Sequence, residues 1–378
     1  MTTADAITIP TDLLPGDGRF GCGPSKVRQE ATDALASVGT SYLGTSHRKA
    51  TVQFTVAALR NALAEMLVLP DGYEILLGNG GTTAFWDAAT FHLVDDIAQT
   101  AVMGEFSSKF SKAIAAAPHL GDPRIVDATP GTAAHLVGEA GIDTYCTVHN
   151  ETSTGVAIAP VRPSGADAGA LVLTDATSAA GGLRFDANQT DCYYFAPQKC
   201  LASDGGLWIA ACSPAAIERI ERLSSGDRWC PAFLDLGIAL ENSRKDQTYN
   251  TPALATIFLA LEQASWINNN GGLAWSAGRC DANAAAIYDW ADGHELASPF
   301  IADETVRSHV VATIDFDESI DANAIAATLR ANNILDTESY RKLGRNQLRV
   351  ALFPAIETSD LVALTACIDH VIGEMTAA

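Results

Sequence analysis

The stretch that decides the fold reads LVLTDATSAAGG over residues 171–182, DCYYFAPQKC over 191–200 and LASDGGLWIAA over 201–211. Short apolar runs separated by a glycine-rich turn are typical of buried strands in an α/β sheet. Asp175 closes the first run and Lys199 follows the second. Ligands of open α/β sheets bind outside the carboxyl ends of the strands, so this order predicts a site that contains both residues.

The neighbours of Lys199 are mostly aromatic, small or apolar, which predicts that its side chain is partly buried. Burial lowers the pKa of a lysine because it penalises the charged form, and the neutral amine can form a Schiff base with an aldehyde. A carboxylate such as Asp175, placed opposite a pyridinium nitrogen, is what pyridoxal phosphate (PLP) needs to act as an electron sink. The alternative is a core lysine paired with an aspartate, but fully buried lysines are rare.

Composition narrows the class of protein. The 378 residues, 48% of them hydrophobic, can bury a large core and indicate two domains rather than a small binding module. The net charge of -21, with only 24 Lys plus Arg, argues against binding along a polyanion. We therefore expect neither nucleic acid nor an anionic membrane as a partner.

Cysteine usage bears on metals and on the cellular compartment. The eight cysteines form no CxxC pair and show no histidine spacing of a metal site, so we expect no metal. Several lie in apolar runs, as buried free thiols do. The N-terminus carries no basic-then-apolar leader, and no apolar span reaches 18 residues. Together these features predict a soluble protein of the reducing cytoplasm.

A strand, a glycine loop and a helix are predicted in succession over residues 73–94, which read YEILLGNGGTTAFWDAATFHLV. Backbone amides of Gly80, Gly81 and Thr82 at the helix N-terminus would hold a phosphate. The loop is neither GxGxxG nor a Walker loop. A nucleotide-binding α/β protein is a further alternative, weakened by the lack of an acidic ribose partner in the expected frame.

Three other segments carry candidate site residues. Phe106 follows a predicted strand at residues 100–103 and could stack on an aromatic cofactor, although such an aromatic is more often part of the core. The polar run HNETSTG, residues 149–155, comes directly after another strand and indicates a site. Residues 46–48, Ser-His-Arg, could grip a phosphate or carboxylate or could simply begin a solvated helix.

The rest of the chain predicts a polar loop over 241–254, a helix over 255–266, and then alternating helices and strands. The Asn270, Gly271 and Gly272 turn marks the domain boundary. We expect an N-terminal arm or strap (1–18), a large domain (19–270) and a small C-terminal α+β domain (271–378). Cations concentrate in SYRKLGRNQLR, residues 339–349, which suggests an anionic substrate group in so acidic a chain.

The motifs together resemble the phosphoserine aminotransferases of the actinobacterial type, which are class V PLP-dependent enzymes. The match extends over most of the chain, from GRFGCGPSKV to LRVALF. Between these lie GTSHRKATVQ, GNGGTTAFWD, GEFSSKF, HNETSTG, DATSAAGG, FAPQKC and YNTPA, in the family's order. The resemblance implies the fold type I of PLP-dependent transferases, with a mostly parallel seven-stranded sheet, helices on its faces and a small C-terminal domain.

The resemblance assigns roles around the PLP ring. Lys199 would bind the cofactor aldehyde and later shuttle a proton to and from the substrate's Cα. Asp175 would keep the pyridinium nitrogen protonated. Phe106 stands where many relatives carry a stacking tryptophan, Thr152 would bond to a ring substituent, and Gln198 would lie beside the cofactor.

The resemblance also implies how the cofactor phosphate is held. Gly81 and Thr82 would bind it from the same chain. Family members are usually homodimers with sites at the interface, and Asn250 with Thr251 match positions that reach across the dimer to this phosphate.

Substrate groups follow by the same comparison. Arg349 matches the arginine that binds the α-carboxylate, for which a bidentate fork suits a planar group. His47 and Arg48 match a phosphate-binding pair. Many relatives have a His-Arg pair shortly before the carboxylate arginine, whereas this chain has YRKLGR, so three cations stay open as phosphate ligands: Arg341, Lys342 and Arg345.

The implied reaction is reversible amino transfer between 3-phosphohydroxypyruvate with L-glutamate and O-phospho-L-serine with 2-oxoglutarate, in serine biosynthesis. Use of 4-phosphohydroxythreonine, in pyridoxine biosynthesis, is a further option. Alternatives are an alanine-glyoxylate type transaminase, a cysteine desulfurase or a catalytically silent PLP-fold binding protein. A desulfurase usually has a histidine before the lysine, where this chain has Gln198. The intact lysine and acid argue against a silent protein.

Overall fold

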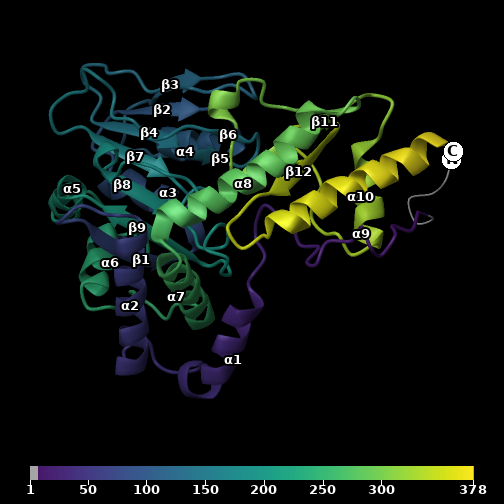
Figure 1. The fold of residues 1–378 in the computed structure, drawn as a ribbon. Coiled ribbons are helices and arrows are strands. Elements are labelled where there is room, and N and C mark those ends of the chain that lie inside the picture. Colours follow the sequence, from purple (N-terminus) through teal and green to yellow (C-terminus); the bar gives the residue numbers. More distant parts are fainter. Residues whose placement is uncertain (1–6, 378) are drawn as a thin grey trace.

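A computed structural model describes residues 7–377, and its largest element is a seven-stranded sheet in the order β1-β9-β8-β7-β4-β2-β3 (Figure 1). β9 runs antiparallel to β1 and β8, and the other adjacent strands are parallel. This confirms the predicted mainly parallel sheet. Its strands are β1 (Glu74–Asn79), β2 (Ala98–Val102), β3 (Arg124–Asp127), β4 (Thr144–Val148), β7 (Leu171–Asp175), β8 (Cys192–Phe195) and β9 (Leu207–Cys212).

Helices cover both faces of this sheet. Successive strand residues point to opposite sides, and here the residues on both sides are mostly apolar. Leu76 and Tyr194 pack in one core with α3 (Gly81–His92), α4 (Glu105–Ala116), α5 (Pro214–Ser224) and α6 (Leu236–Ser243). Ile75 and Tyr193 pack in another core with α2 (Ala50–Met66) and α7 (Leu254–Asn269), beside which lies α1 (Gln29–Tyr42). The strands are therefore buried on both sides, which explains their continuous apolar runs.

A second, antiparallel sheet lies in the C-terminal part of the chain and consists of β10 (Ala297–Pro299), β11 (Val311–Phe316) and β12 (Gln347–Ala351). It packs in a core of its own with α8 (Gly272–Asp292), α9 (Ala322–Ala331) and α10 (Thr358–Ala377). The long helix α8 runs from the large sheet to this second sheet (Figure 1). Small elements complete the described chain: β5 (Asn150–Glu151), β6 (Val156–Ala157) and 3-10 turns at Ala187–Gln189 and Glu304–Val306.

Residues 7–18 lie as a strap across the C-terminal helices. Ile9 is buried in the core of the second sheet, and its backbone N–H donates to Asn332 Oδ1 at 3.0 Å. The backbone N–H of Gly16 donates to Asp360 Oδ1, on α10, at 2.9 Å. The first six residues of the predicted arm lie outside the described residues. The division into an arm and two domains stays a prediction.

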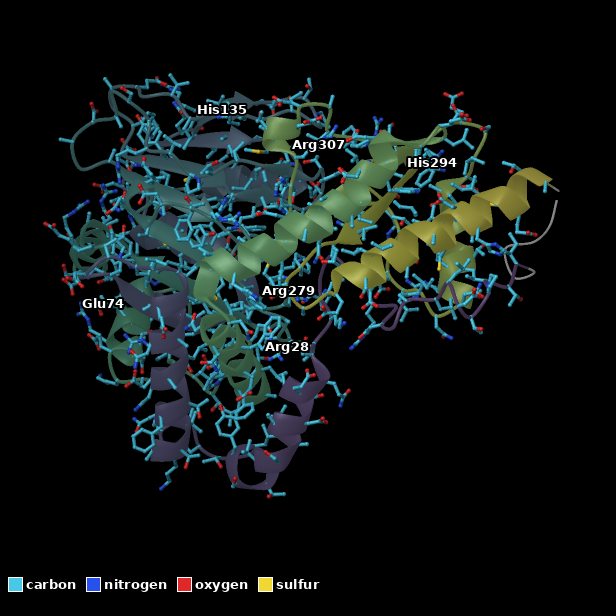
Figure 2. All side chains as sticks on the ribbon, viewed as in Figure 1. Arg28, Glu74, His135, Arg279, His294 and Arg307 are labelled. Atoms are coloured by element: carbon cyan, nitrogen blue, oxygen red, sulfur yellow. The ribbon has the colours of Figure 1, made fainter. Side chains whose placement is uncertain are left out.

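An arginine pair connects the helices near the start of α8. Figure 2 shows Arg279 on α8 and Arg28 just before α1. Their guanidinium carbons lie 5.7 and 4.3 Å from the ring centroid of Trp266, on α7. Arg279 Nε also donates to the carbonyl of Pro354 at 2.9 Å. The pair therefore joins α7 and α8 to the segment that leads into α10.

The predicted polar loop at 241–254 was wrong at its start, because α6 continues to Ser243. The Asp235 carboxylate caps this helix by accepting from the backbone N–H groups of Gly237 and Ile238. Leu240 is buried against the large sheet and holds the helix there. Among residues 7–377, no helix is both long and apolar enough to cross a membrane.

Candidate active site

A cavity of about 240 Å³ opens at the carboxyl edge of the parallel strands, between the turn after β1, the start of α4 and the loop after β8. The predicted residues that line it are Gly81, Thr82, Phe106, Thr152, Asp175, Gln198 and Lys199. The structure thus brings together, from five separate segments, the acid, the lysine, the glycine loop and the aromatic ring. The carboxyl edge of the sheet is where such sites are expected.

Lys199 extends into the cavity from the loop after β8, and its Nζ donates to the backbone carbonyl of Cys22 at 2.6 Å. Desolvation by the surrounding protein and, to a smaller extent, the positive charge of Arg349 lower the pKa of Lys199 to about 8. A Cβ on Gly23 would lie 1.8 Å from Nζ, so the glycine leaves the space that the lysine occupies. These contacts hold a readily deprotonated amine at one fixed place in the cavity.

Asp175 ends β7 and is buried, which raises the pKa of its carboxyl to about 6 despite two hydrogen bonds that favour the anion. Oδ2 accepts from the indole Nε1 of Trp86 at 3.0 Å, and Oδ1 accepts from the backbone N–H of Thr177 at 2.9 Å. A cation placed against this carboxylate would lower its pKa again. The site therefore favours a positively charged ligand atom beside Asp175.

The glycine loop forms the N-terminus of α3. Gly80 has φ +108°, and a Cβ there would lie 2.6 Å from that of Ala84, so only glycine fits this turn. A Cβ on Gly81 would meet no described atom within 4 Å, which shows open space at the helix start. Thr82 Oγ1 is hydrogen-bonded to Thr177 Oγ1 at 2.8 Å. Free N–H groups and the helix dipole at this end favour an anion such as a phosphate.

Polar side chains from the segment after β4 line the opposite wall. Asn150 Nδ2 and Thr152 Oγ1 both donate to Ser178 Oγ, at 2.8 and 2.7 Å. Asn150 Oδ1 and Gln198 Oε1 are buried and find no hydrogen-bond partner among residues 7–377. Because buried polar atoms are nearly always paired, these two oxygens indicate a ligand with hydrogen-bond donors.

Arg349, on β12, reaches this wall from the second sheet. Its Nη1 donates to the backbone carbonyl of Thr152 at 3.2 Å. Its Nε is buried without a hydrogen-bond partner in the described part of the chain. The ring centroid of Tyr340 lies 5.3 Å from the guanidinium carbon and 5.9 Å from the ring centroid of Phe106. An unpaired guanidinium N–H beside the cavity is available to an anionic group.

Other predicted site residues lie outside the described lining of this cavity. His47 Nδ1 is hydrogen-bonded to Thr251 Oγ1 at 3.1 Å, and its Nε2 is buried without a partner within residues 7–377. Burial, and then the charge of Arg48, lower the pKa of His47. Asn250 Oδ1 accepts a hydrogen bond from Asn79 Nδ2 at 2.7 Å, and Asn79 is the residue just before the glycine loop.

The three alternative cations have different surroundings. Lys342 forms an ion pair with Glu105, at the start of α4. Arg345 forms an ion pair with Asp315 on β11, and its guanidinium carbon lies 4.3 Å from the Phe300 ring centroid. Like Arg48, Arg341 is exposed. Lys342 and Arg345 are therefore each paired with a carboxylate within the described chain, and all three cations stay open as phosphate ligands.

Sequence reasoning missed four residues of the site: Trp86, Thr177, Ser178 and Tyr340. The spacing of four between Thr82 and Trp86 places both on one helix face and could have indicated the indole. Thr177 and Ser178 lie two and three positions after Asp175 in the motif DATSAAGG, so the motif itself could have indicated them. Nothing local distinguishes Tyr340, because its contacts with Phe106 and Arg349 are long-range.

The residues present fit PLP. Asp175 can face a pyridinium nitrogen, Lys199 offers an amine for the aldehyde, and the open space at Gly81 can take a phosphate. The unpartnered oxygens of Asn150 and Gln198 lie in the same lining. No group of three or more His, Cys, Asp or Glu residues that could hold a metal ion occurs in the chain from residue 7 to 377.

The fold and this site define a PLP-dependent aminotransferase of class V. The class-V aminotransferase family model matches residues 135–336, more than half of the chain. The structure is similar to a phosphoserine aminotransferase from Cytophaga hutchinsonii (TM-score 0.86, 21% identity, 93% of this chain and 99% of that one). It is also similar to a PLP-bound phosphoserine aminotransferase from Trichomonas vaginalis (TM-score 0.80, 19% identity, 93% and 99%).

Sequence relatives identify the particular family. The chain is 54% identical to the phosphoserine aminotransferase of Rhodococcus jostii, over 97% of this chain and 98% of that protein. It is 53% identical to that of Corynebacterium glutamicum (strain R), with the same shares covered. The chain belongs to the phosphoserine aminotransferase family.

Proposed function

We propose that the chain catalyses reversible, PLP-dependent amino transfer between O-phospho-L-serine with 2-oxoglutarate and 3-phosphohydroxypyruvate with L-glutamate. The observation that carries the proposal is that Lys199 and Asp175 line one cavity, while Arg349, which has an unpaired guanidinium N–H, contacts Thr152 in the wall of that cavity. The identity of more than half to named phosphoserine aminotransferases supports the substrate class. Serine biosynthesis is the pathway that this reaction serves.

PLP, when bound, withdraws the electron pair left behind when the substrate's Cα loses its proton. Lys199 binds the cofactor through its neutral amine and acts as the general base and acid at Cα, for which a pKa of about 8 is suitable near neutral pH. Asp175 keeps the pyridinium proton in place, and its bonds from Trp86 and Thr177 fix the carboxylate plane. Phe106, which lines the cavity, would pack against the cofactor ring.

The remaining residues bind and orient. The N-terminus of α3 at Gly81 and Thr82 would hold the cofactor phosphate. Thr152 and Gln198, which line the same cavity, would bond to groups beside the ring. Arg349 binds the substrate's α-carboxylate. The substrate phosphate is bound by cations at the mouth, from the set His47, Arg48, Arg341, Lys342 and Arg345.

We further propose a homodimer in which Asn250 and Thr251 of one copy contact the cofactor phosphate held by the other. Two large aromatic side chains in this region are exposed: Tyr249 (48%), which precedes Asn250, and Phe233 (47%), which lies beside the glycine loop. Gly80 lies at this surface, since a Cβ there would be 3.7 Å from the Phe233 ring. Exposed aromatic groups of this kind mark protein interfaces. Light scattering at micromolar concentration should give twice the chain mass, and a monomer would contradict the dimer.

We also propose the cytoplasm as the compartment, because all eight cysteines have free thiols.

The test of the reaction uses PLP-loaded protein with O-phospho-L-serine and 2-oxoglutarate. Formation of equimolar L-glutamate and 3-phosphohydroxypyruvate is the expected result. The Lys199→Ala variant is the control for cofactor chemistry and should form neither product. Glutamate formed equally well from L-alanine or from L-serine would point instead to a transaminase for unphosphorylated substrates.

A further inference from the structure

Glu151 lies directly behind the cavity wall and has no role among the groups described above. It follows β4, in the two-residue strand β5, and its side chain is buried. Its carboxylate accepts five hydrogen bonds, and three of the donors are backbone N–H groups, which can only donate. The five donors are Phe106 N (3.3 Å), Ser107 N (2.9 Å), Ser107 Oγ (2.8 Å), Ser153 N (3.2 Å) and Ser153 Oγ (2.6 Å).

Two of these backbone donors belong to the first turn of α4. A carboxylate at this position satisfies N–H groups that have no partner within the helix and interacts favourably with the helix dipole. Ser153 adds a further bond, since its Oγ accepts from the backbone N–H of Glu105 at 3.0 Å. The segment after β4 therefore holds the start of α4 by the backbone at three consecutive residues.

The packing around the carboxylate leaves it little freedom. A Cβ on Gly104 would lie 2.5 Å from Glu151 Cγ and 2.5 Å from Ser153 Oγ. The turn before α4 therefore sits directly against the glutamate side chain. A shift of this side chain would displace the start of α4, and a shift of the start of α4 would displace the side chain.

Both sides of this network face the proposed chemistry. Phe106, whose N–H the carboxylate binds, lines the cavity, and so does Thr152, which follows Glu151 in the chain. Glu105 pairs with Lys342, one of the candidate phosphate ligands. The glutamate thus connects two walls of the cavity without lining it.

We propose that Glu151 is a positioning residue that holds α4 so that the Phe106 ring packs against the cofactor, an inference that rests on the proposed function. It does not contact the reacting atoms. Its carboxylate sets the place of the ring through the backbone, so that cofactor affinity and the asymmetric environment of the cofactor depend on it.

The variant Glu151→Gln tests this because it keeps the size but replaces one acceptor oxygen by an NH₂ group that faces N–H donors. We expect PLP to bind the variant about tenfold more weakly, the ratio that follows from losing one hydrogen bond to a charged acceptor. Affinity is measured by quenching of protein fluorescence on titration with PLP. Visible circular dichroism of the bound cofactor, which reports the ring's surroundings, should change as well.

Asp143→Asn is the matched control. Asp143 precedes β4, at the strand end away from the cavity, and its carboxylate also accepts three backbone N–H groups, those of Asp95, Asp96 and Ile97, at 2.7–2.9 Å. Its replacement should lower the melting temperature of the apoprotein yet leave PLP affinity and visible dichroism unchanged. A purely structural role of Glu151 predicts the same pattern for Glu151→Gln.

A double-mutant cycle with Phe106→Leu locates the effect. If Glu151 acts through the ring, the double variant binds PLP about as weakly as Phe106→Leu alone, whereas additive losses would overturn the proposal. If Glu151→Gln does not fold, Ser107→Ala, which removes one donor to the carboxylate, gives the same comparison. Wild-type PLP affinity with unchanged dichroism in the folded variant refutes the positioning role, whereas failure of the wild-type protein to bind PLP refutes the proposed function instead.

Discussion

The surroundings of Lys199 predict how its reactivity depends on pH. An exposed lysine with a pKa of 10.5 is about 0.03% neutral at pH 7, whereas one with a pKa of about 8 is about 9% neutral. Only the neutral amine attacks an aldehyde, so burial makes Lys199 roughly 300-fold more available at this pH. We expect the contribution of Lys199 deprotonation to the rate constant for covalent PLP capture to rise about tenfold per pH unit up to about pH 8 and to level off above it.

The assay follows the visible absorbance of covalently held PLP after rapid mixing with the apoprotein, from pH 6 to pH 10. Each rate constant is divided by that of a simple primary amine of pKa near 10.5, measured at the same pH, so that ionisation of PLP itself cancels. The ratio should stay level below pH 8 and fall about tenfold per unit above it. Lys49→Ala, which removes an exposed lysine, is the matched control and should leave the curve unchanged.

A ratio that stays level up to pH 10 would refute the reasoning, because Lys199 would then titrate like an exposed amine. Whether the pKa of Lys199 is lowered or ordinary, the Lys199→Ala variant should lack the visible absorbance of covalently held PLP. A persistent signal in that variant would refute the assignment of Lys199 itself.

Three further predictions concern the same cavity. Lys199→Met should stabilise the apoprotein at pH 7 by up to ~3 kcal/mol, because the pKa of Lys199 in the folded protein lies below its pKa in the unfolded chain. The wild type should gain stability as the pH rises from 8 to 10.5, so that the difference in unfolding free energy between wild type and variant vanishes. Urea unfolding at several pH values measures this difference. Trp86→Phe removes the indole donor to Asp175, which should raise the pKa of that carboxyl and lower kcat about tenfold, with little change in melting temperature. An unchanged kcat would contradict the role of the indole. Gly23→Ala places a methyl group where Nζ lies, so the folded variant should lose covalent PLP capture, and normal capture would show that the lysine is held elsewhere.

The core of the site was predictable because it follows from the order of the strands. Asp175 is the last residue of β7, and Lys199 comes four positions after the end of β8. The carboxyl ends of adjacent parallel strands lie at one edge of a sheet. The glycine loop after β1 lies at the same edge because β9 runs antiparallel to both β1 and β8, so that these two strands point in one direction. Local sequence carried this information because each residue's place in the site depends mainly on where its own strand ends.

The contacts that tune the site were not predictable from the sequence. The carbonyl that accepts the hydrogen bond from Lys199 belongs to Cys22, 177 positions away, and the indole that donates to Asp175 belongs to a residue 89 positions away. The pairing of Arg345 with Asp315 likewise depends on the register of β11 and β12. Such contacts depend on tertiary packing, for which single-sequence patterns carry no signal. Glu151 stood in a polar run that was recognised as a site, yet its direction toward α4 appears only in three dimensions.

Phosphate selectivity is tested most directly by the half-reaction with a single amino acid. PLP-loaded protein is mixed with O-phospho-L-serine or with L-serine, without a keto acid, and the visible absorbance of the bound cofactor is followed. We predict rapid loss of that absorbance with O-phospho-L-serine and conversion at least a hundredfold slower with L-serine, because two or more charge-assisted bonds to phosphate are missing. Equal conversion by both amino acids would contradict the proposal that the cations at the cavity mouth select a phosphorylated substrate.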